Sequence, residues 1–160
     1  MSGPHYLPDT MPAPSPSPDG LDEPYWASAR QGLLLAQRCG GCRTWQWGPE
    51  WLCHRCRSFD MGWEPVDGKG FIYSWERPHH PVHPALKECG PYLVVMVELP
   101  GAGGIRMVGN LLGLPMQPVV IGSPVEAVFE HHETGLRPYT LVQWRVAGAD
   151  HAAAGEGGTR

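Results

Sequence analysis

Four of the five cysteines in the sequence form two close pairs, Cys39 with Cys42 and Cys53 with Cys56, in the pattern C-x2-C-x10-C-x2-C. Each pair can form a tight turn that directs two sulfur atoms at one ion, and two such turns complete a tetrahedral thiolate site for zinc. Because the protein fills all four positions, none remains for water or substrate. The spacing therefore predicts a structural zinc site and not a catalytic one.

The segment that carries these cysteines is too short to build a core of its own. Metal binding is expected to supply its folding free energy, on the order of 10 kcal/mol for structural sites. Gly40 and Gly41 are expected to give the first turn its permissive backbone angles. A redox pair would need a C-x-x-C at the start of a helix that follows a strand. A hairpin rich in Pro, Gly and Trp does not offer that context, so the metal interpretation is favoured.

Outside the paired cysteines, the candidates for chemistry are His79, His80 and His83 in the stretch RPHHPVHP. Prolines stiffen this stretch and reduce the entropy lost on docking, so it could be a docking loop, a wall of a ligand channel or a plain exposed loop. Its spacing lacks helix or strand register, which disfavours a second metal site. Cys89 is expected to be a spare thiol. A hydrolase or hydratase acting alone stays an alternative, although no paired carboxylates or Ser/His/Asp set support it.

The expected ribbon also carries surface groups for recognition. Arg38, Arg43, Arg55 and Arg57 outnumber the single Glu50, which predicts a locally basic face. Such a face could meet the phosphates of a ligand, an acidic partner or nucleic acid, or simply be solvated.

Three tryptophans, Trp45, Trp47 and Trp51, lie between the cysteine pairs. They exceed what so small a unit can bury, so at least one is expected to pack on the barrel or on a partner.

Net charge limits the classes of partner. The value of −4 argues against nucleic acid as the main partner, since such proteins usually carry a basic excess. A nucleic-acid-binding protein remains an alternative because zinc ribbons and OB-folds both serve that role elsewhere. We find no apolar run long enough to span a bilayer and no secretory signal, so the expectations are a cytoplasmic protein without membrane or nucleic-acid partners.

The elements that must position these groups are mostly strands. Charged residues make up only 18% of the chain, and 18 prolines and 21 glycines favour short strands and turns. Five strands within about 75 residues suit a small OB-like barrel, with a small sandwich as the alternative. The predicted order is a disordered Pro-rich arm at 1–20, a short helix at 21–32, the zinc ribbon at 33–66, a five-stranded OB-fold barrel at 67–147 and a disordered tail at 148–160.

The order of these features resembles the zinc-ribbon/OB-fold acyl-CoA-associated protein family. The resemblance covers roughly residues 22–146, and its landmarks include Tyr25–Trp26, the lead-in GLLLAQRC, the four cysteines, Trp63 and the stretches GFIYSW, PYLVVMVEL, MVGNLLG and IGSPVEAVFE. It implies a rubredoxin-like zinc ribbon followed by an OB-fold barrel, with Zn²⁺ as a structural cofactor.

The resemblance also implies a helper function. Members of the family are accessory subunits of acyl-CoA-processing complexes. They pair with thiolase-fold enzymes, including sterol carrier protein X-like thiolases and aldolases, and some accompany hotdog-fold enoyl-CoA hydratases in the degradation of steroid side chains or aromatic acids. The chain is then not catalytic alone but is a required subunit of an aldolase or thiolase complex.

On this resemblance, contacts to acyl-CoA or to the partner enzyme are expected at one set of residues: Trp75, Arg77, His79, His80, His83, Tyr92 and Asn110. The stretch around the three histidines is longer and richer in histidine than the short H-x-P segment usual in the family. Asn110 could bind a thioester or pantetheine amide, or could satisfy a turn.

Overall fold

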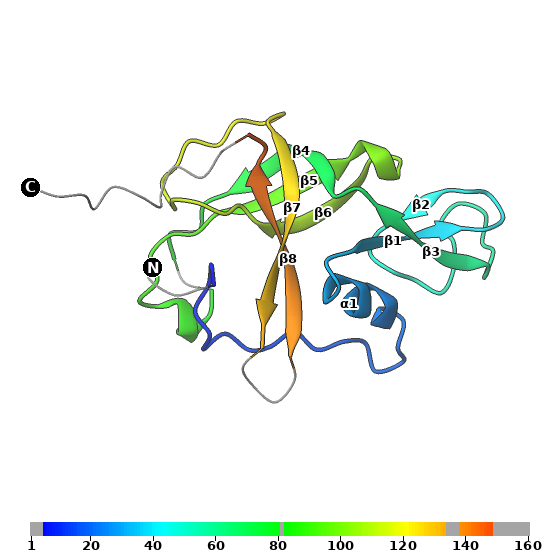
Figure 1. The fold of residues 1–160 in the computed structure, drawn as a ribbon, viewed down its shortest axis with the longest axis horizontal. Coiled ribbons are helices and arrows are strands. Elements are labelled where there is room, and N and C mark those ends of the chain that lie inside the picture. Colours follow the sequence, from blue (N-terminus) through cyan, green and yellow to red (C-terminus); the bar gives the residue numbers. More distant parts are fainter. Residues whose placement is uncertain (1–4, 81, 134–137, 149–160) are drawn as a thin grey trace, which may run out of the picture.

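The computed structural model describes residues 5–80, 82–133 and 138–148. These residues are mostly strand, with one short α-helix and two 3-10 helices (Figure 1). In chain order the elements are α1 (Glu23–Ala29), β1 (Leu34–Cys39), β2 (Trp45–Gln46), β3 (Met61–Val66), β4 (Lys69–Glu76), η1 (Pro84–Leu86), β5 (Val94–Leu99), η2 (Pro100–Ala102), β6 (Ile105–Asn110), β7 (Pro124–His132) and β8 (Tyr139–Val146). In the described part of the chain, no helix has the length and apolar character needed to cross a membrane.

The strands form two antiparallel sheets, which lie side by side in Figure 1. The smaller sheet is the ribbon, in the order β2-β1-β3, and the larger has the order β6-β5-β4-β7-β8. The outer strands of the larger sheet meet just after β6, where Leu111 pairs in parallel with Trp144 and the Leu112 amide donates to the Trp144 carbonyl oxygen at 2.7 Å. The larger sheet is therefore a nearly closed five-stranded OB-fold barrel. This confirms the predicted fold and excludes the sandwich.

The barrel core follows the alternation of side chains along β5. Leu93, Val95, Val97 and Leu99 are fully buried, while the residues between them are only half-buried. Successive side chains of a strand point to opposite faces, so one face of β5 lines the barrel interior. The other strands complete this core with Ile72, Met107, Val125, Val142 and Trp144.

Helix α1 and two ribbon tryptophans join the ribbon to the barrel. Pro24 lies in the first turn of α1, as expected for a residue without an amide donor, and the helix ends before Gly32. Tyr25 is largely buried, which raises its pKa to about 12, and its ring packs edge-on against Trp47 with 5.0 Å between centroids. Trp45 and Trp47 both pack against the barrel core. Trp45 also lies against Gly103, between η2 and β6, so the prediction that a ribbon tryptophan packs on the barrel is confirmed.

The N-terminal arm differs from its prediction. We expected residues 1–20 to be disordered, but residues 5–20 lie along the barrel and α1 (Figure 1). Tyr6 is buried against Leu86 and Tyr92, and its hydroxyl accepts a hydrogen bond from the Leu93 amide at 3.0 Å. Burial of Tyr6 anchors the arm at one point, and the prolines reduce the entropy that the segment loses on ordering. Of the tail predicted at 148–160, residues 149–160 lie outside the described residues.

Replacing Gly70 with alanine is expected to destabilise the barrel by about 1–3 kcal/mol, the usual cost of overpacking a core. A Cβ at Gly70 would lie 2.5 Å from the Glu98 carbonyl oxygen and 2.5 Å from Val97 Cγ1. Gly62→Ala is the matched strand control, because its Cβ would meet only the Arg38 carbonyl oxygen at 3.7 Å. Chemical denaturation of both variants checks this, and equal midpoints would contradict the close approach of β4 and β5.

Candidate functional site

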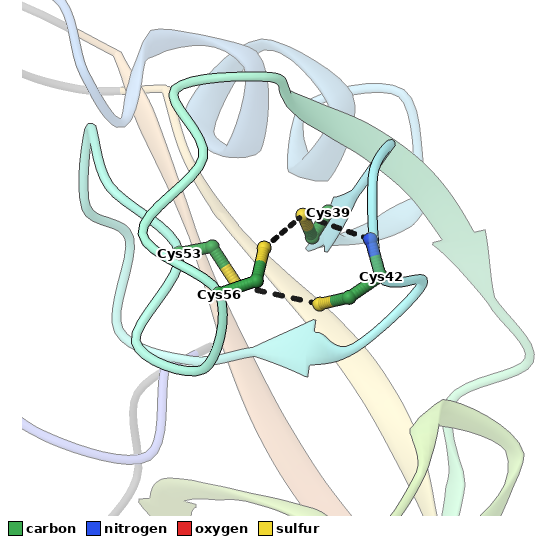
Figure 2. A group of neighbouring side chains, drawn as sticks. All are labelled: Cys39, Cys42, Cys53 and Cys56. Atoms are coloured by element: carbon green, nitrogen blue, oxygen red, sulfur yellow. Dashed lines mark hydrogen bonds between the residues drawn. The ribbon is translucent and has the colours of Figure 1, made fainter.

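The four paired cysteines converge at one end of the ribbon (Figure 2). Cys39 ends β1, Cys42 follows in the next turn, and Cys53 and Cys56 belong to the loop between β2 and β3. The Sγ atoms are 3.5 Å apart for Cys39 and Cys56 and 3.6 Å apart for Cys42 and Cys53, and all four lie within 4.8 Å of one another.

These separations fit one tetrahedral ion. Zinc–sulfur bonds of about 2.3 Å place tetrahedral sulfurs about 3.8 Å apart, close to what the cluster already has. The two turns also have matching geometry, since the Arg43 amide donates to the Cys39 carbonyl oxygen at 2.9 Å and the Arg57 amide to the Cys53 carbonyl oxygen at 3.0 Å. The donor set, its geometry and the paired turns are those of a structural metal site.

The backbone strain of the turns lies elsewhere than predicted. Arg43 and Arg57, each following a cysteine pair, have positive φ angles of 61° and 62°, whereas Gly40 and Gly41 do not have positive φ. Gly40 instead lies close to the exposed Asp60 side chain, whose carboxylate would have to move aside for a Cβ at this position. The sequence suggested glycine flexibility, and the structure shows a close approach instead.

The electrostatics of the cluster favour a shared cation. Hydrogen bonds from the Thr44 hydroxyl and amide lower the pKa of Cys42 to about 6. At Cys56 the Ser58 amide acts to lower the pKa, but the nearby Cys42 and Cys39 sulfurs and burial raise it to about 12. Sulfurs this close cannot all carry charge unaided, and a divalent ion bound to all four would favour the thiolate at each.

The predicted basic face of the ribbon carries one more acidic group than expected, Glu64, and still has more arginines than carboxylates. Glu64 on β3 pairs with Arg38 at 2.9 Å and with Arg43 at 2.6 Å. The Arg38 hydrogen bond is the main reason that the pKa of Glu64 lies below its usual range. Arg55 and Arg57 are exposed. The sequence analysis counted only Glu50 near these arginines, whereas strand pairing brings Glu64 to them from outside the cysteine segment.

Arg77 organises the connection between β6 and β7. Its Nε donates to the Pro115 carbonyl oxygen at 2.9 Å, and its Nη2 donates to the Gln117 carbonyl oxygen at 2.7 Å. Its guanidinium also lies 5.1 Å from the centroid of the partly exposed Trp75 ring. The structure thus gives Arg77 a role in shaping a loop, next to Trp75 at the surface.

The three histidines of the proline-rich stretch do not converge. His79 and His80 are exposed, whereas His83 Nδ1 accepts a hydrogen bond from the Ala85 amide at 3.1 Å and caps η1. The two exposed rings remain accessible to a ligand or a partner, and the third ring stabilises the loop.

The last two predicted contact residues have structural neighbours. Tyr92 is 7% exposed and packs with Tyr6 and Leu86. The Asn110 side-chain amide donates to the Leu93 carbonyl oxygen at 3.0 Å, which holds the end of β6 against the start of β5. The Asn110 side chain therefore satisfies a backbone carbonyl oxygen next to a neighbouring strand.

An exposed apolar surface covers the outside of the barrel on β4, β5 and β6. The strand register pairs Met96 of β5 with Val108 of β6. Arg106 is two residues before Val108 and so points to the same face of β6. Its guanidinium lies 3.4 Å from the Tyr73 ring centroid, so Tyr73 lies on that face too. Phe71, Tyr73 and Val108 are 47%, 46% and 60% exposed. We call Phe71, Tyr73, Met96 and Val108 the outer face.

A pocket of about 440 Å³ opens beside Phe71, between β4 and β7. Its lining includes Lys69, Pro100, Val125 and Glu126, and it includes none of the predicted contact residues. The pocket is mainly apolar, with one basic residue, Lys69, and two acidic residues, Asp67 and Glu126. Such a lining suits an apolar side chain of a partner better than a catalytic reaction.

Family models match both parts of the structure. The model of the rubredoxin-like zinc ribbon domain of ChsH2 matches residues 26–62, and the model of the C-terminal OB-fold domain of ChsH2 matches residues 63–130. The two matches adjoin and follow the order of ribbon and barrel seen in the structure.

The chain belongs to the ChsH2 (DUF35) family.

Among solved structures, this ChsH2-family chain is similar to one described as "Ltp2-ChsH2(DUF35) aldolase", with a TM-score of 0.68, 34% identity and coverage of 84% of this chain and 99% of that chain. A DUF35-family protein of Sulfolobus solfataricus has a TM-score of 0.55 at 14% identity, which shows the shared fold alone.

Two sequence relatives carry different names. A protein of Thermomonospora curvata named "Probable enoyl-CoA hydratase alpha subunit" is 41% identical over 107 residues, which are 65% of this chain and 32% of that protein. This chain thus spans about a third of that relative's length. A "DUF35 domain-containing scaffold protein" of Methanocaldococcus jannaschii is 32% identical over 98 residues, which are 60% of this chain and 67% of that protein.

The structure also reveals a group that sequence reasoning missed in this ChsH2-family chain. His5, Asp9 and His132 place potential metal-ligating atoms within 4.8 Å of one another. Hydrogen bonding to Asp9 is the main reason that the pKa of His5 is raised. No spacing rule could have found the group, because more than 120 residues separate its two segments.

Proposed function

We propose that this ChsH2-family chain is a noncatalytic accessory subunit that docks on a thiolase-fold aldolase or thiolase and helps to form its acyl-CoA site. The observation that carries the proposal is the likeness to the chain in the Ltp2-ChsH2 aldolase, which extends over 99% of that chain at 34% identity. The scaffold name of the Methanocaldococcus jannaschii relative supports a role without catalysis. Steroid side-chain degradation, or a related acyl-CoA degradation, is the process that we propose for the complex.

Zinc is the structural cofactor in this proposal, bound by Cys39, Cys42, Cys53 and Cys56. The sulfur separations of 3.5 and 3.6 Å and the match to a rubredoxin-like zinc ribbon support it. The ion would supply folding free energy and hold the ribbon rigid, and it would leave no position for substrate.

The docking surface in this proposal is the outer face. Exposed aromatic side chains beside a shallow pocket are typical of the buried centre of a protein interface. Arg106 and Glu98 lie 3.0 Å apart on the same side of the barrel and offer a polar rim. A thiolase-fold enzyme would therefore meet an apolar patch bordered by charge.

The acyl-CoA molecule is proposed to pass near the loop that follows β4. Trp75, His79 and His80 are exposed there and could contact the ligand or the enzyme. Arg77 and His83 would act indirectly, because their polar atoms hold the loop backbone.

The experiment that tests docking is co-purification with the thiolase-fold enzyme encoded nearest to this chain. A stable heteromeric complex is expected by size exclusion with light scattering. The double variant Phe71→Ser and Val108→Ser is expected to weaken the complex at least about tenfold, as loss of central apolar contacts does. The control is Leu114→Ser with Met116→Ser, which changes two apolar residues outside the outer face that are 76% and 63% exposed. An enzyme that is soluble and fully active without this chain, and that does not bind it, would contradict the proposed function.

The name of the Thermomonospora curvata relative favours a second partner class, a hotdog-fold enoyl-CoA hydratase. The same purification with a hydratase in place of the thiolase-fold enzyme distinguishes the two. Under either partner, this chain alone is expected to show no turnover of acyl-CoA thioesters.

A further inference from the structure

A second group of metal-ligating side chains lies where the N-terminal arm meets the end of β7. His5 and Asp9 belong to the arm, and His132 is the last residue of β7. His5 Nδ1 is 2.5 Å from Asp9 Oδ1, and His132 Nδ1 is 3.8 Å from the same oxygen. Two nitrogens and a carboxylate oxygen thus gather between segments that are far apart in the sequence.

The other nitrogen of each imidazole is already used. His5 Nε2 lies 2.9 Å from the His131 carbonyl oxygen, and His132 Nε2 lies 2.9 Å from Glu130 Oε1. A carbonyl or carboxylate oxygen can only accept, so both Nε2 atoms carry the proton. Metal-binding histidines typically donate their second N–H to a backbone carbonyl or a carboxylate, and both rings here do so.

Glu130 is itself held in place. Its Oε2 accepts from the Tyr6 amide at 2.8 Å, and its Oε1 is 3.3 Å from Gln143 Nε2. The supporting contacts of the two histidines therefore come from a fixed carboxylate and from the backbone of a strand. Such support orients a ligand before a metal arrives.

The facing nitrogen and oxygen atoms require a cation. With Nε2 protonated, a neutral His5 ring directs its Nδ1 lone pair at the Asp9 carboxylate from 2.5 Å, an arrangement that repels unless a proton or a metal ion lies between. The rings of His5 and His132 are stacked with 3.9 Å between centroids, so charging both rings would add repulsion. One metal shared by both rings satisfies both Nδ1 atoms with a single cation.

We propose that His5, Asp9 and His132 bind a divalent transition metal of the zinc class, which fastens the N-terminal arm to the barrel. Two imidazole nitrogens and one carboxylate oxygen are a donor set that such metals prefer. Tetrahedral bonds of about 2.0–2.1 Å place donor atoms about 3.4 Å apart. Asp9 Oδ1 lies 2.5 Å from His5 Nδ1 and 3.8 Å from His132 Nδ1, so the two distances lie on either side of that value.

Only the arm has to adjust for binding. His132 is 6% exposed and stacks on Tyr139 with 4.4 Å between centroids, so its ring is fixed. Asp9 is exposed and His5 lies on the arm, so rotation of these two side chains opens the stacked pair toward a common ion. The fourth position is left to water. We call the site formed by His5, Asp9 and His132 the clasp. It would hold the arm to the barrel next to Tyr6, whose buried side chain is the apolar anchor of the same segment.

Metal counting on the full chain tests the proposal. The zinc-loaded protein is equilibrated with Co²⁺ in a buffer that contains no other transition metal. The number of metal ions per chain is then measured by mass spectrometry of the digested sample. Wild-type protein is expected to hold two metal ions, one in the ribbon and one in the clasp. Cobalt in the clasp should give d–d absorption bands without the sulfur-to-cobalt charge-transfer bands that a ribbon-bound cobalt would add.

The variants His5→Phe and Asp9→Asn are each expected to hold one metal and to lose the clasp bands. The first keeps an aromatic ring for stacking, and the second keeps the shape of the side chain. His131→Gln is the matched control, since its carbonyl oxygen, and not its ring, contacts His5. It should keep both metals. Thermal unfolding verifies that every variant is folded. One metal per chain in folded wild-type protein, with no change in either variant, would mean that the cluster holds a proton alone and would overturn the proposal.

Discussion

Cys39→Ser is expected to unfold the ribbon, residues 33–66, and to leave the barrel folded. The ribbon sheet has three strands of at most 6 residues, and β2 has only 2. Such a sheet cannot offset its own ordering entropy, so metal binding must supply free energy on the order of 10 kcal/mol. Loss of one of four thiolates leaves an incomplete site whose remaining sulfurs repel one another.

Hydrogen exchange with mass spectrometry measures this effect region by region. Amides of β1 and β3 should exchange freely in Cys39→Ser, while amides of β5 stay protected. Trp45 and Trp47 should become solvent-exposed, with a red-shifted fluorescence spectrum, because both pack against the barrel core only through the folded ribbon.

Cys89→Ser is the control for that experiment. Cys89 lies outside the cluster, half-buried, with a weak 3.9 Å contact to the Ala85 carbonyl oxygen. Its replacement should leave metal content and exchange unchanged. A ribbon that stays protected in Cys39→Ser would show that packing on the barrel, and not the metal, folds it.

Trp144→Ala is expected to destabilise the barrel by about 3–5 kcal/mol, the usual cost of truncating a buried tryptophan. Trp144 is fully buried on β8, and its carbonyl oxygen accepts the Leu112 amide where the barrel closes. A Cβ on Gly109 would lie 2.8 Å from its indole ring, so the side chain fills the space between β6 and β8. The variant leaves a cavity at the closing seam.

Trp144→Phe is the informative companion to that variant. Among the described residues, Trp144 Nε1 is a buried nitrogen without a hydrogen-bond partner. Phenylalanine keeps much of the apolar contact and removes the unpaired donor, so part of the lost packing is offset. We expect it to cost less than half as much as alanine in urea denaturation. Equal losses in the two variants would contradict an unpaired indole donor.

The metal cluster and the strand pattern could be predicted from the sequence because both are local. Two C-x-x-C turns determine where pairs of sulfurs can point, and alternation in the stretch LVVMVEL determines which side of β5 is buried. The number of barrel strands, five, therefore agrees with the sequence-based prediction.

The errors share a physical cause, which is contact between segments distant in the sequence. Composition predicted a disordered arm, but Tyr6 packs against Leu86 and Tyr92, which lie 80 and 86 positions further along the chain. Residues near the cysteines predicted only Glu50 as an acidic neighbour of the ribbon arginines, but β1–β3 pairing also brings Glu64 to Arg38 and Arg43.

By itself, the sequence determined the cysteine site, the order of ribbon and barrel, and the family resemblance, since each depends on residue type and spacing along the chain. The tertiary structure alone decided which exposed groups share the outer face, that Arg77 and Asn110 hold backbone, and that His5 and Asp9 meet His132. Those outcomes depend on how strands pair and how the barrel closes. The free energy of such contacts comes from residues far apart in the sequence, so no local sequence pattern predicts it.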